Sequence, residues 1–234
     1  MASRKPAAQT HGNEMIVLAA NNSNLLFGYL AGKYEGQVGV MCSPQSGWRK
    51  PMWFLPYAID NGMYAATQSG KEWPEEEFLT MCEKARDSDQ APLFVVVPDV
   101  LYDRDATLRR FDKYAPQLEK LGLPLAMACQ DGMTPQDVPE GVVAFIGGSD
   151  AFKSKAWDFC QAGLRVHVGR ANSYKRLVAC KKSGVFSVDG SVWFKMGAET
   201  NPIHRKTAYI KPLIKYLEWA QDESDAQKEL FKCH

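Results

Sequence analysis

The chain has 234 residues, of which 45% are hydrophobic and 24% charged, a composition typical of a globular protein with a sizeable core. A formal net charge of +1 argues against a protein that is basic throughout, although net charge hides how charges are distributed. The six cysteines form no CxxC or CxC pair, and no apolar run approaches membrane-spanning length, which argues against a disulfide framework, a zinc cluster and a membrane protein. We therefore expect a cytosolic protein that uses no metal and no cofactor.

Residues 1–13 are polar and predict a disordered arm, followed by a single domain over residues 14–234. Apolar runs predict strands at 15–20, 38–42, 53–59, 93–97, 123–129, 142–146, 165–168 and 184–191. Helices are predicted at 74–86, 103–121, 151–162 and 173–183, with one helical turn at 134–138 and a long helix from about 212 to 231.

Local signals support two of these helix starts. Pro74 stands at a plausible first helical position, and glutamates fill the turn after it, where carboxylates favour the helix dipole. Asp103 is a typical N-cap residue for the helix that follows it. Both helices are thus expected to begin at these positions.

The order of the elements predicts the fold. The strands lack polar alternation and helices separate them, which indicates a parallel sheet covered on both faces. The strand–helix unit repeats about eight times, so we predict a compact (β/α)8 barrel of the TIM type. A doubly wound open sheet is the alternative, but no Gly-x-Gly-x-x-Gly or Gly-Lys-Ser/Thr loop supports a nucleotide-binding sheet of that kind.

Polar residues and glycines end the predicted strands on their C-terminal side. They are Asp60, Asp99, Gln130, Gly147, Gly148, Gly169 and Asp189. In a barrel these strand ends meet at one mouth, where the active sites of this fold lie. Any single member has an ordinary alternative as a cap or turn, and Asp-Gly is a common turn pair. Three carboxylates at one mouth raise one another's pKa, so their clustering indicates a pocket that uses them.

The chemistry of this set suggests a division of roles. A carboxylate on a rigid strand end can attack an anomeric carbon and form a covalent glycosyl intermediate while a second carboxylate moves protons. A third carboxylate can accept from the paired N–H groups of a flat heterocycle, beside an amide side chain and glycine N–H groups. We interpret the inventory as a base-exchange site.

Six short motifs carry a resemblance to a known family. They are Asp60-Asn61-Gly62, Val97-Pro98-Asp99, Gln130-Asp131-Gly132, Ile146-Gly147-Gly148-Ser149, Val166-His167-Val168-Gly169-Arg170 and Ser187-Val188-Asp189-Gly190. In order and spacing they resemble the motifs of tRNA-guanine transglycosylases. The likeness is greater to their relatives, the 7-deazaguanine DNA transglycosylases of phages and bacterial DNA-modification clusters, and covers roughly Asp60 to Ser191.

The resemblance implies a TIM barrel that replaces a guanine in a polynucleotide with a 7-deazaguanine, such as the cyano-substituted preQ0, without cutting the strand. It implies that Asp189 is the nucleophile on C1′ and Asp60 the general acid and base. By the same resemblance Asp99, Gln130 and the Gly147-Gly148 backbone hold the base edge, with Asn61 next to the 7-substituent. His167 matches no catalytic residue of the tRNA enzymes and stays open between a contact at the mouth and a core imidazole.

Two departures from the tRNA enzymes favour DNA as the substrate. The tRNA enzymes carry a structural zinc site after the barrel, whereas Cys233 and His234 stand alone here. The chain is also shorter than those enzymes. The cytoplasm of a bacterium or of a phage-infected host is then the expected location, and a homo-oligomer or a partner subunit stays open.

A DNA partner fits the basic segment near the last motifs. Arg170, Lys175, Arg176 and Lys182 are the predicted phosphate contacts, although each alone fits a solvated helix face equally well. The target nucleotide should be extruded from the duplex, with Trp48, Trp193 and Phe194 as candidates for stacking in its place. The alternatives are an RNA-directed enzyme, a hydrolytic nucleoside or DNA N-glycosylase, and a non-catalytic barrel that only binds.

Overall fold

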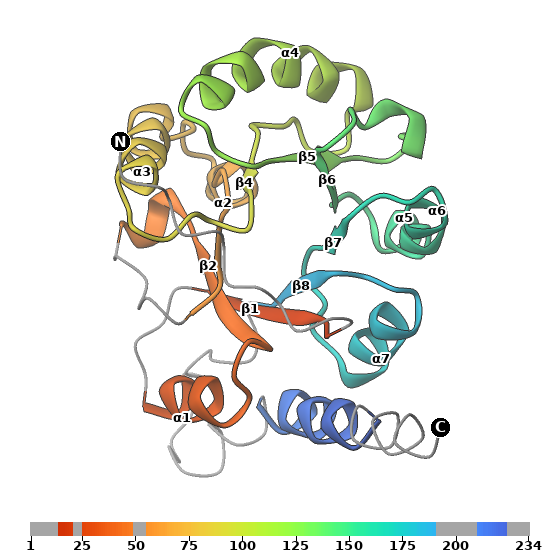
Figure 1. Ribbon diagram of the computed structural model, residues 1–234. Helices are drawn as coiled ribbons and strands as arrows, with labels where there is room; N and C mark the ends of the chain where they lie inside the picture. The colour runs from red at the N-terminus through yellow and green to blue at the C-terminus, as the bar shows by residue number, and fades with distance from the viewer. Residues whose placement is uncertain (1–13, 21–24, 49–54, 191–209, 224–234) are drawn as a thin grey trace.

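Eight parallel strands close into a barrel surrounded by helices in the computed structural model, which describes residues 14–20, 25–48, 55–190 and 210–223 (Figure 1). The strands are β1 (Ile16–Ala20), β2 (Val38–Cys42), β3 (Tyr57–Ile59), β4 (Val95–Val96), β5 (Leu125–Cys129), β6 (Val143–Ile146), β7 (Val166–Val168) and β8 (Ser187–Gly190). Each strand pairs with its neighbours in chain order, and β1 pairs with both β2 and β8. This closure confirms the predicted (β/α)8 barrel and rules out the open sheet.

Helices follow most strands and form the outer layer. They are α1 (Leu25–Lys33), α2 (Met63–Ser69), α3 (Glu75–Arg86), α4 (Arg104–Lys120), α5 (Asp150–Lys153), α6 (Ala156–Gln161) and α7 (Tyr174–Lys182), with 3-10 turns η1 (Pro44–Ser46) and η2 (Pro135–Asp137). Residues 210–223 form a further helix. The predicted arm 1–13 and the end of the predicted last helix lie outside the described residues.

The helices differ from prediction in two respects. α1 and α2 were not predicted, and the single helix expected over 151–162 is two short helices, α5 and α6, separated by Ser154 and Lys155. The starts of α3 and α4 agree with the prediction. Pro74 immediately precedes α3, and the Asp103 carboxylate accepts a 2.9 Å hydrogen bond from the Ala106 N–H at the start of α4.

The strands bury apolar side chains on both faces, as the missing polar alternation predicts. Inward-facing residues such as Leu18 and Phe94 form a cluster inside the barrel. Outward-facing residues such as Val17 and Val168 pack against the helices in a larger cluster. Because both faces are covered, the strands are held rigidly and the residues that follow them have fixed positions.

The helix over 210–223 completes the outer ring between α7 and α1 (Figure 1). Tyr216 is fully buried, and the Lys215 ammonium lies 4.6 Å from the centre of the Tyr174 ring on α7. The last helix is thus packed onto the barrel beside the strand that carries Asp189. None of the helices in the described ranges combines the length and apolar character that a membrane crossing requires.

Candidate active site

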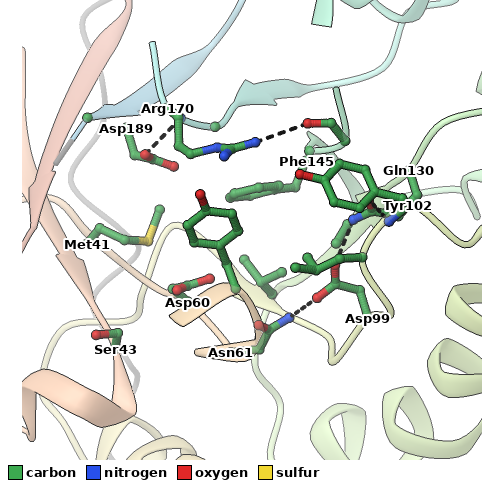
Figure 2. Close-up of a pocket in the computed structure, with 18 residues that line it drawn as sticks. Met41, Ser43, Asp60, Asn61, Asp99, Tyr102, Gln130, Phe145, Arg170 and Asp189 are labelled. Carbon is green, nitrogen blue, oxygen red and sulfur yellow. Dashed lines mark hydrogen bonds between the residues drawn. The ribbon is translucent and has the colours of Figure 1, made fainter. Parts of the chain in front are cut away.

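A cavity of about 210 Å³ opens at the barrel mouth, the end where the carboxyl ends of the strands meet. One water molecule needs about 10–15 Å³ of such space, so the cavity has room for a small-molecule ligand. Its lining includes every strand-end residue singled out from the sequence: Asp60, Asn61, Asp99, Gln130, Gly147, Gly148, Gly169, Arg170 and Asp189. Asp189 and Asp60 lie on one side, opposite the group made by Asp99, Asn61 and Gln130 (Figure 2).

Asp99 is held by two side-chain amides. Its Oδ1 accepts a 2.9 Å hydrogen bond from Asn61 Nδ2, and its Oδ2 accepts a 2.7 Å bond from Gln130 Nε2. The Arg110 guanidinium donates to the Asp99 backbone carbonyl at 2.9 Å. The carboxylate therefore has a fixed orientation at the base of the cavity, where its side chain is almost completely buried.

The two amides that hold Asp99 are themselves fixed. Asn61 Oδ1 accepts from the Met63 N–H at 2.8 Å, and Gln130 Oε1 accepts from the Tyr102 N–H at 2.9 Å. Asn61 thus contacts the cavity but uses its amide to position Asp99. Asn61 lines the cavity, where the predicted contact with a base substituent would be made, but its amide is already hydrogen-bonded to Asp99 and Met63.

Asp60 follows β3 directly, and its N–H donates to the Cys42 carbonyl of β2 at 2.7 Å. Burial, together with the negative charges of Asp189 and Asp99, raises the pKa of Asp60 to about 7, against the opposing effect of the backbone N–H groups of Gly62 and Asn61. An aspartate with such a pKa can both give and take a proton near neutral pH.

Burial also raises the pKa of Asp99, to about 6. The Asn61 amide, the charge of Arg110 and the Gln130 amide oppose the rise because they favour the ionised carboxylate. The cavity therefore contains two aspartates whose proton affinities exceed that of an ordinary surface aspartate.

Asp189 extends from β8 into the cavity between two donors. Its Oδ1 accepts a 2.9 Å hydrogen bond from the Arg170 N–H, and its Oδ2 lies 3.2 Å from His167 Nε2. The side chain is 18% exposed, so one part of the carboxylate faces the cavity while the rest is held. A carboxylate in this setting can act on a ligand without first reorganising.

Two residues at the cavity have left-handed backbone conformations that are rare outside glycine. Tyr102 has φ of 62° and Arg170 has φ of 57°. Each turn serves the site, since Tyr102 presents its N–H to Gln130 and Arg170 presents its N–H to Asp189. Strained backbone of this kind is concentrated at functional positions.

The glycines of the mouth serve mainly by leaving space. Gly147 and Gly169 direct their N–H groups into the sheet, to Cys129 and Ile146 at 3.0 and 3.1 Å, so the expected donation from these two to a ligand is wrong. A Cβ on Gly169 would lie 3.0 Å from the Phe145 ring. Of Gly147, Gly148 and Gly169, only Gly148 has an N–H without an acceptor among the described residues, so it can donate to a ligand.

His167 is a buried residue inside the barrel rather than an exposed contact at the mouth. It has 0% exposure, and its ring stacks on Phe145 with centroids 4.6 Å apart. Its two nitrogens contact Ser187 and Asp189. Of the two alternatives that the sequence left open, His167 is therefore a core imidazole, and it also contacts the Asp189 carboxylate at the mouth.

The predicted phosphate contacts divide between the two ends of α7. Arg170 and the first turn of α7, with Lys175 and Arg176, are at the mouth, whereas Lys182 ends the helix and lies toward the opposite end of the barrel. Seven residues of helix span about 10 Å, so Lys182 lies about that much further from the mouth than Lys175 does. The cause is the alternation of direction between strand and helix in the barrel.

A lysine that the sequence analysis missed belongs to the same region. Lys153 on α5 has a side chain that is only 3% exposed, and its ammonium is 3.7 Å from Asp150, which also binds Arg176 at 2.9 Å. Burial lowers the pKa of Lys153 to about 8, with a contribution from the positive charge of Arg170. Positive charge thus accumulates beside the Asp189 side of the mouth.

Of the three aromatic residues predicted to stack at the cavity, the structure describes only Trp48, which is not among the cavity residues. Trp48 packs edge-on against Tyr57 with centroids 6.1 Å apart, and Trp193 and Phe194 lie outside the described residues. The cavity is instead lined by Tyr64 and Tyr102, which are 39% and 55% exposed. The Arg170 guanidinium lies 4.5 Å from the centre of the Tyr64 ring. No sequence signal marked the two tyrosines, since neither ends an apolar strand.

No protein-family model matches the chain, and no curated protein matches it in sequence. Among solved structures, a candidate fructose-1,6-bisphosphate aldolase from Coccidioides immitis is 12% identical with a TM-score of 0.54, over 90% of this chain and 89% of that one. A variant of the tryptophan synthase α-subunit from Pyrococcus furiosus is 10% identical with a TM-score of 0.54, over 88% and 98%. At these identities the likeness shows the barrel fold alone. Within the described residues, no group of three or more acidic, histidine or cysteine side chains is arranged to hold a metal ion.

Proposed function

We propose that the protein is an enzyme that exchanges guanine in DNA for a 7-deazaguanine such as preQ0, through a covalent aspartyl–nucleotide intermediate. The observation that carries the proposal is the arrangement of three aspartates around one cavity, with Asp60 and Asp189 on one side and Asp99 on the other (Figure 2). Glycosyl exchange needs a nucleophile and a proton carrier near the sugar carbon, and a separate group to hold the base.

In the proposed reaction an oxygen of Asp189 attacks C1′ of the target deoxyguanosine. The bond between C1′ and N9 breaks, its electrons leave with the guanine, and Asp60 supplies the proton that the departing base takes up. The incoming 7-deazaguanine then loses its N9 proton to Asp60, and N9 attacks C1′ and releases Asp189. Asp60 with a pKa of about 7 suits both proton transfers. Two displacements retain the configuration at C1′ and leave the strand intact.

The opposite side of the cavity supports recognition of a guanine-like edge. Asp99 can accept from adjacent N–H groups, and the Gly148 N–H can donate to a carbonyl oxygen. Tyr102 offers an exposed aromatic face beside them. The carboxylate is held in place by Asn61 and Gln130, so recognition costs little reorganisation.

The positive charge of Arg170, Lys153, Lys175 and Arg176 supports a polynucleotide as the partner. The choice of DNA rests on the motif resemblance. Aldol chemistry through a Schiff base, by analogy with the aldolase of similar fold, is disfavoured because no lysine is among the cavity residues of the described chain.

Incubation of the protein with duplex DNA, single-stranded DNA or tRNA and radiolabelled preQ0 tests the proposal. We expect label in deoxynucleosides after digestion of the DNA, with an equal release of free guanine. Label in tRNA alone would make the polymer assignment wrong, and guanine release without incorporation would indicate a hydrolytic N-glycosylase. The absence of both guanine release and incorporation with every one of these polymers would contradict the proposal as a whole.

Two variants assign the chemistry in that assay. Asp189→Asn should abolish both guanine release and incorporation while the circular dichroism spectrum stays unchanged. Asp105→Asn is the matched control, because the Asp105 side chain is 71% exposed on α4 and is not among the cavity residues. Exchange that survives in Asp189→Asn would remove Asp189 from the role of nucleophile.

A further inference from the structure

Three inward-facing side chains on β7 and β8 form a continuous hydrogen-bonded row. Ser187 Oγ lies 2.8 Å from His167 Nδ1, and His167 Nε2 lies 3.2 Å from Asp189 Oδ2. The register of the sheet creates the row, because His167 pairs with Ser187 and the side chain two residues further along β8 lies on the same face. The same three residue types in this order occur in serine hydrolases.

Burial shows that the row works in the opposite direction to a hydrolase triad. Ser187 and His167 both have 0% exposure, whereas the Asp189 side chain is 18% exposed and lines the cavity. A serine sealed inside the barrel cannot meet a substrate. The carboxylate is the end of the row that meets the ligand, and the serine is its anchor.

We propose that His167, oriented by Ser187, is a positioning residue that fixes the reactive carboxylate of Asp189; this inference rests on the proposed function of Asp189 as the nucleophile. An ionised carboxylate only accepts hydrogen bonds, so His167 Nε2 carries the proton that faces Asp189. Nδ1 of the neutral ring is then an acceptor, and the Ser187 hydroxyl donates to it. Ser187 therefore selects the tautomer that points an N–H at Asp189.

With this tautomer, each carboxylate oxygen of Asp189 has one donor. His167 Nε2 binds Oδ2, and the Arg170 N–H binds Oδ1 at 2.9 Å. The two donors come from opposite ends of the carboxylate, so the group cannot rotate about its Cβ–Cγ bond without losing both. The remaining lone pairs are held in a constant direction toward the cavity.

The imidazole is itself held by aromatic neighbours. Phe145 stacks on it at an interplanar angle of 24°, and Phe94 meets it edge-on with centroids 5.0 Å apart. Gly169 leaves the space that the Phe145 ring occupies. Because the imidazole is buried among aromatic rings, each of its hydrogen bonds is stronger than the equivalent bond in water.

Three variants separate positioning from a purely structural role. His167→Phe keeps a ring between Phe94 and Phe145 but removes both nitrogens. His167→Gln returns an amide N–H that can reach Asp189 and gives up the bond to Ser187. Ser187→Ala leaves the ring in place and frees its tautomer.

In the exchange assay we expect His167→Phe to lower kcat about 100-fold with KM for preQ0 within about twofold, because misplacing a reacting group by about 1 Å costs on this order. His167→Gln should recover at least about tenfold of that loss, and Ser187→Ala should lie between wild type and His167→Phe. Unchanged kcat in folded His167→Phe, a loss confined to KM, or no recovery in His167→Gln would each overturn the inference.

A second readout does not depend on exchange activity. Nitrogen-15 NMR of the wild-type protein should show His167 as the tautomer protonated at Nε2, with a slowly exchanging ring proton. Asp189→Ala should lose that proton signal, and Asp105→Ala should retain it. A proton on Nδ1, or a signal indifferent to Asp189→Ala, would contradict the orienting role. If wild type exchanges no base yet shows this signature, the proposed function fails while the hydrogen-bonded row stands.

Discussion

Asp60 and Asp99 retain protons at pH values where an exposed aspartate is ionised. Their pKa values are raised to about 7 and about 6, in both cases chiefly by burial. Carboxyl groups whose pKa is raised by burial in a cavity are a common sign of a functional site. Asp60 lies near the nucleophile and suits proton transfer, whereas Asp99 is bound by two amides and suits recognition.

The raised pKa of Asp60 predicts a pH-dependent stability difference between wild type and Asp60→Asn. The folded state holds the Asp60 proton more tightly than the unfolded state does. The ionisation of Asp60 therefore costs wild type no stability below about pH 4, and its cost to the free energy of unfolding grows as pH rises to about 7. Asparagine stays neutral throughout. One pKa unit corresponds to about 1.4 kcal/mol, so Asp60→Asn should gain about 2–4 kcal/mol over wild type at pH 7.

Urea unfolding of both proteins from pH 4 to pH 8 measures this difference. It should grow between pH 4 and pH 7 and then level off, while Asp105→Asn, at an exposed site, should follow wild type at every pH. A difference that does not vary with pH would mean that Asp60 ionises normally. The same variant should lose base exchange, since asparagine carries no transferable proton.

Much of the site could be predicted from the residues that end apolar strands, because a barrel brings strand ends to one mouth. The sequence could not predict that Tyr102, Lys153 and Phe145 lie at the site, since their positions depend on loop geometry and on packing between elements distant in sequence. Nor could the sequence show that the Gly147 and Gly169 N–H groups donate to carbonyl groups inside the sheet. Residue type indicates what a side chain can do, and only the fold shows which partners it has already.

At the scale of elements, apolar runs predicted the strands well and short helices poorly. α1 contains Gly28 and Gly32, which lower helix propensity and obscure its apolar face. α2 is bounded by Gly62 and Gly70, both with positive φ, and has only seven residues. Such helices form because they pack against the outer face of the barrel. Tertiary packing, rather than local sequence, stabilises them.

α4 contains Pro116 in its interior, on the solvent-exposed side. Proline removes one helical hydrogen bond and strains the preceding turn. We predict that Pro116→Ala stabilises the protein by about 1–3 kcal/mol, measured by urea unfolding, without changing base exchange. Gln117→Ala, at the adjacent exposed position, is the control and should stay within about 0.5 kcal/mol of wild type. A loss of stability in Pro116→Ala would contradict this prediction.

At the scale of the whole molecule, a net charge of +1 conceals a basic region on one side of the mouth. Arg170, Lys153 and Arg176 gather there near the carboxylate of Asp150, whose side chain is 76% exposed. A surface of this kind attracts a polyanion locally while the molecule stays nearly neutral. The fold itself is shared with enzymes of other chemistry, so the residues of the mouth, rather than the barrel, decide the chemistry.

Two exposed lysines on α7 provide a matched test of where DNA binds. Lys175 is in the first turn at the mouth, and Lys182 ends the helix toward the opposite end of the barrel. Lys175→Glu should weaken DNA binding and lower the slope of log Kd against log salt by about 1, whereas Lys182→Glu should leave both unchanged. Fluorescence anisotropy over a salt series measures both. Equal effects of the two variants would place DNA somewhere other than the mouth.

The pairing of β8 with β1 has a consequence for the order in which the molecule is made. Leu18 lies opposite Asp189 in the closed barrel, although nearly the whole chain separates them. As the ribosome releases the chain, Asp60 and Asp99 emerge first, and Asp189 arrives only with the strand that seals the ring. The repulsion that Asp189 exerts on Asp60 is therefore absent from every earlier stage of synthesis. It arises at the final step, when the rest of the barrel is already available to oppose it.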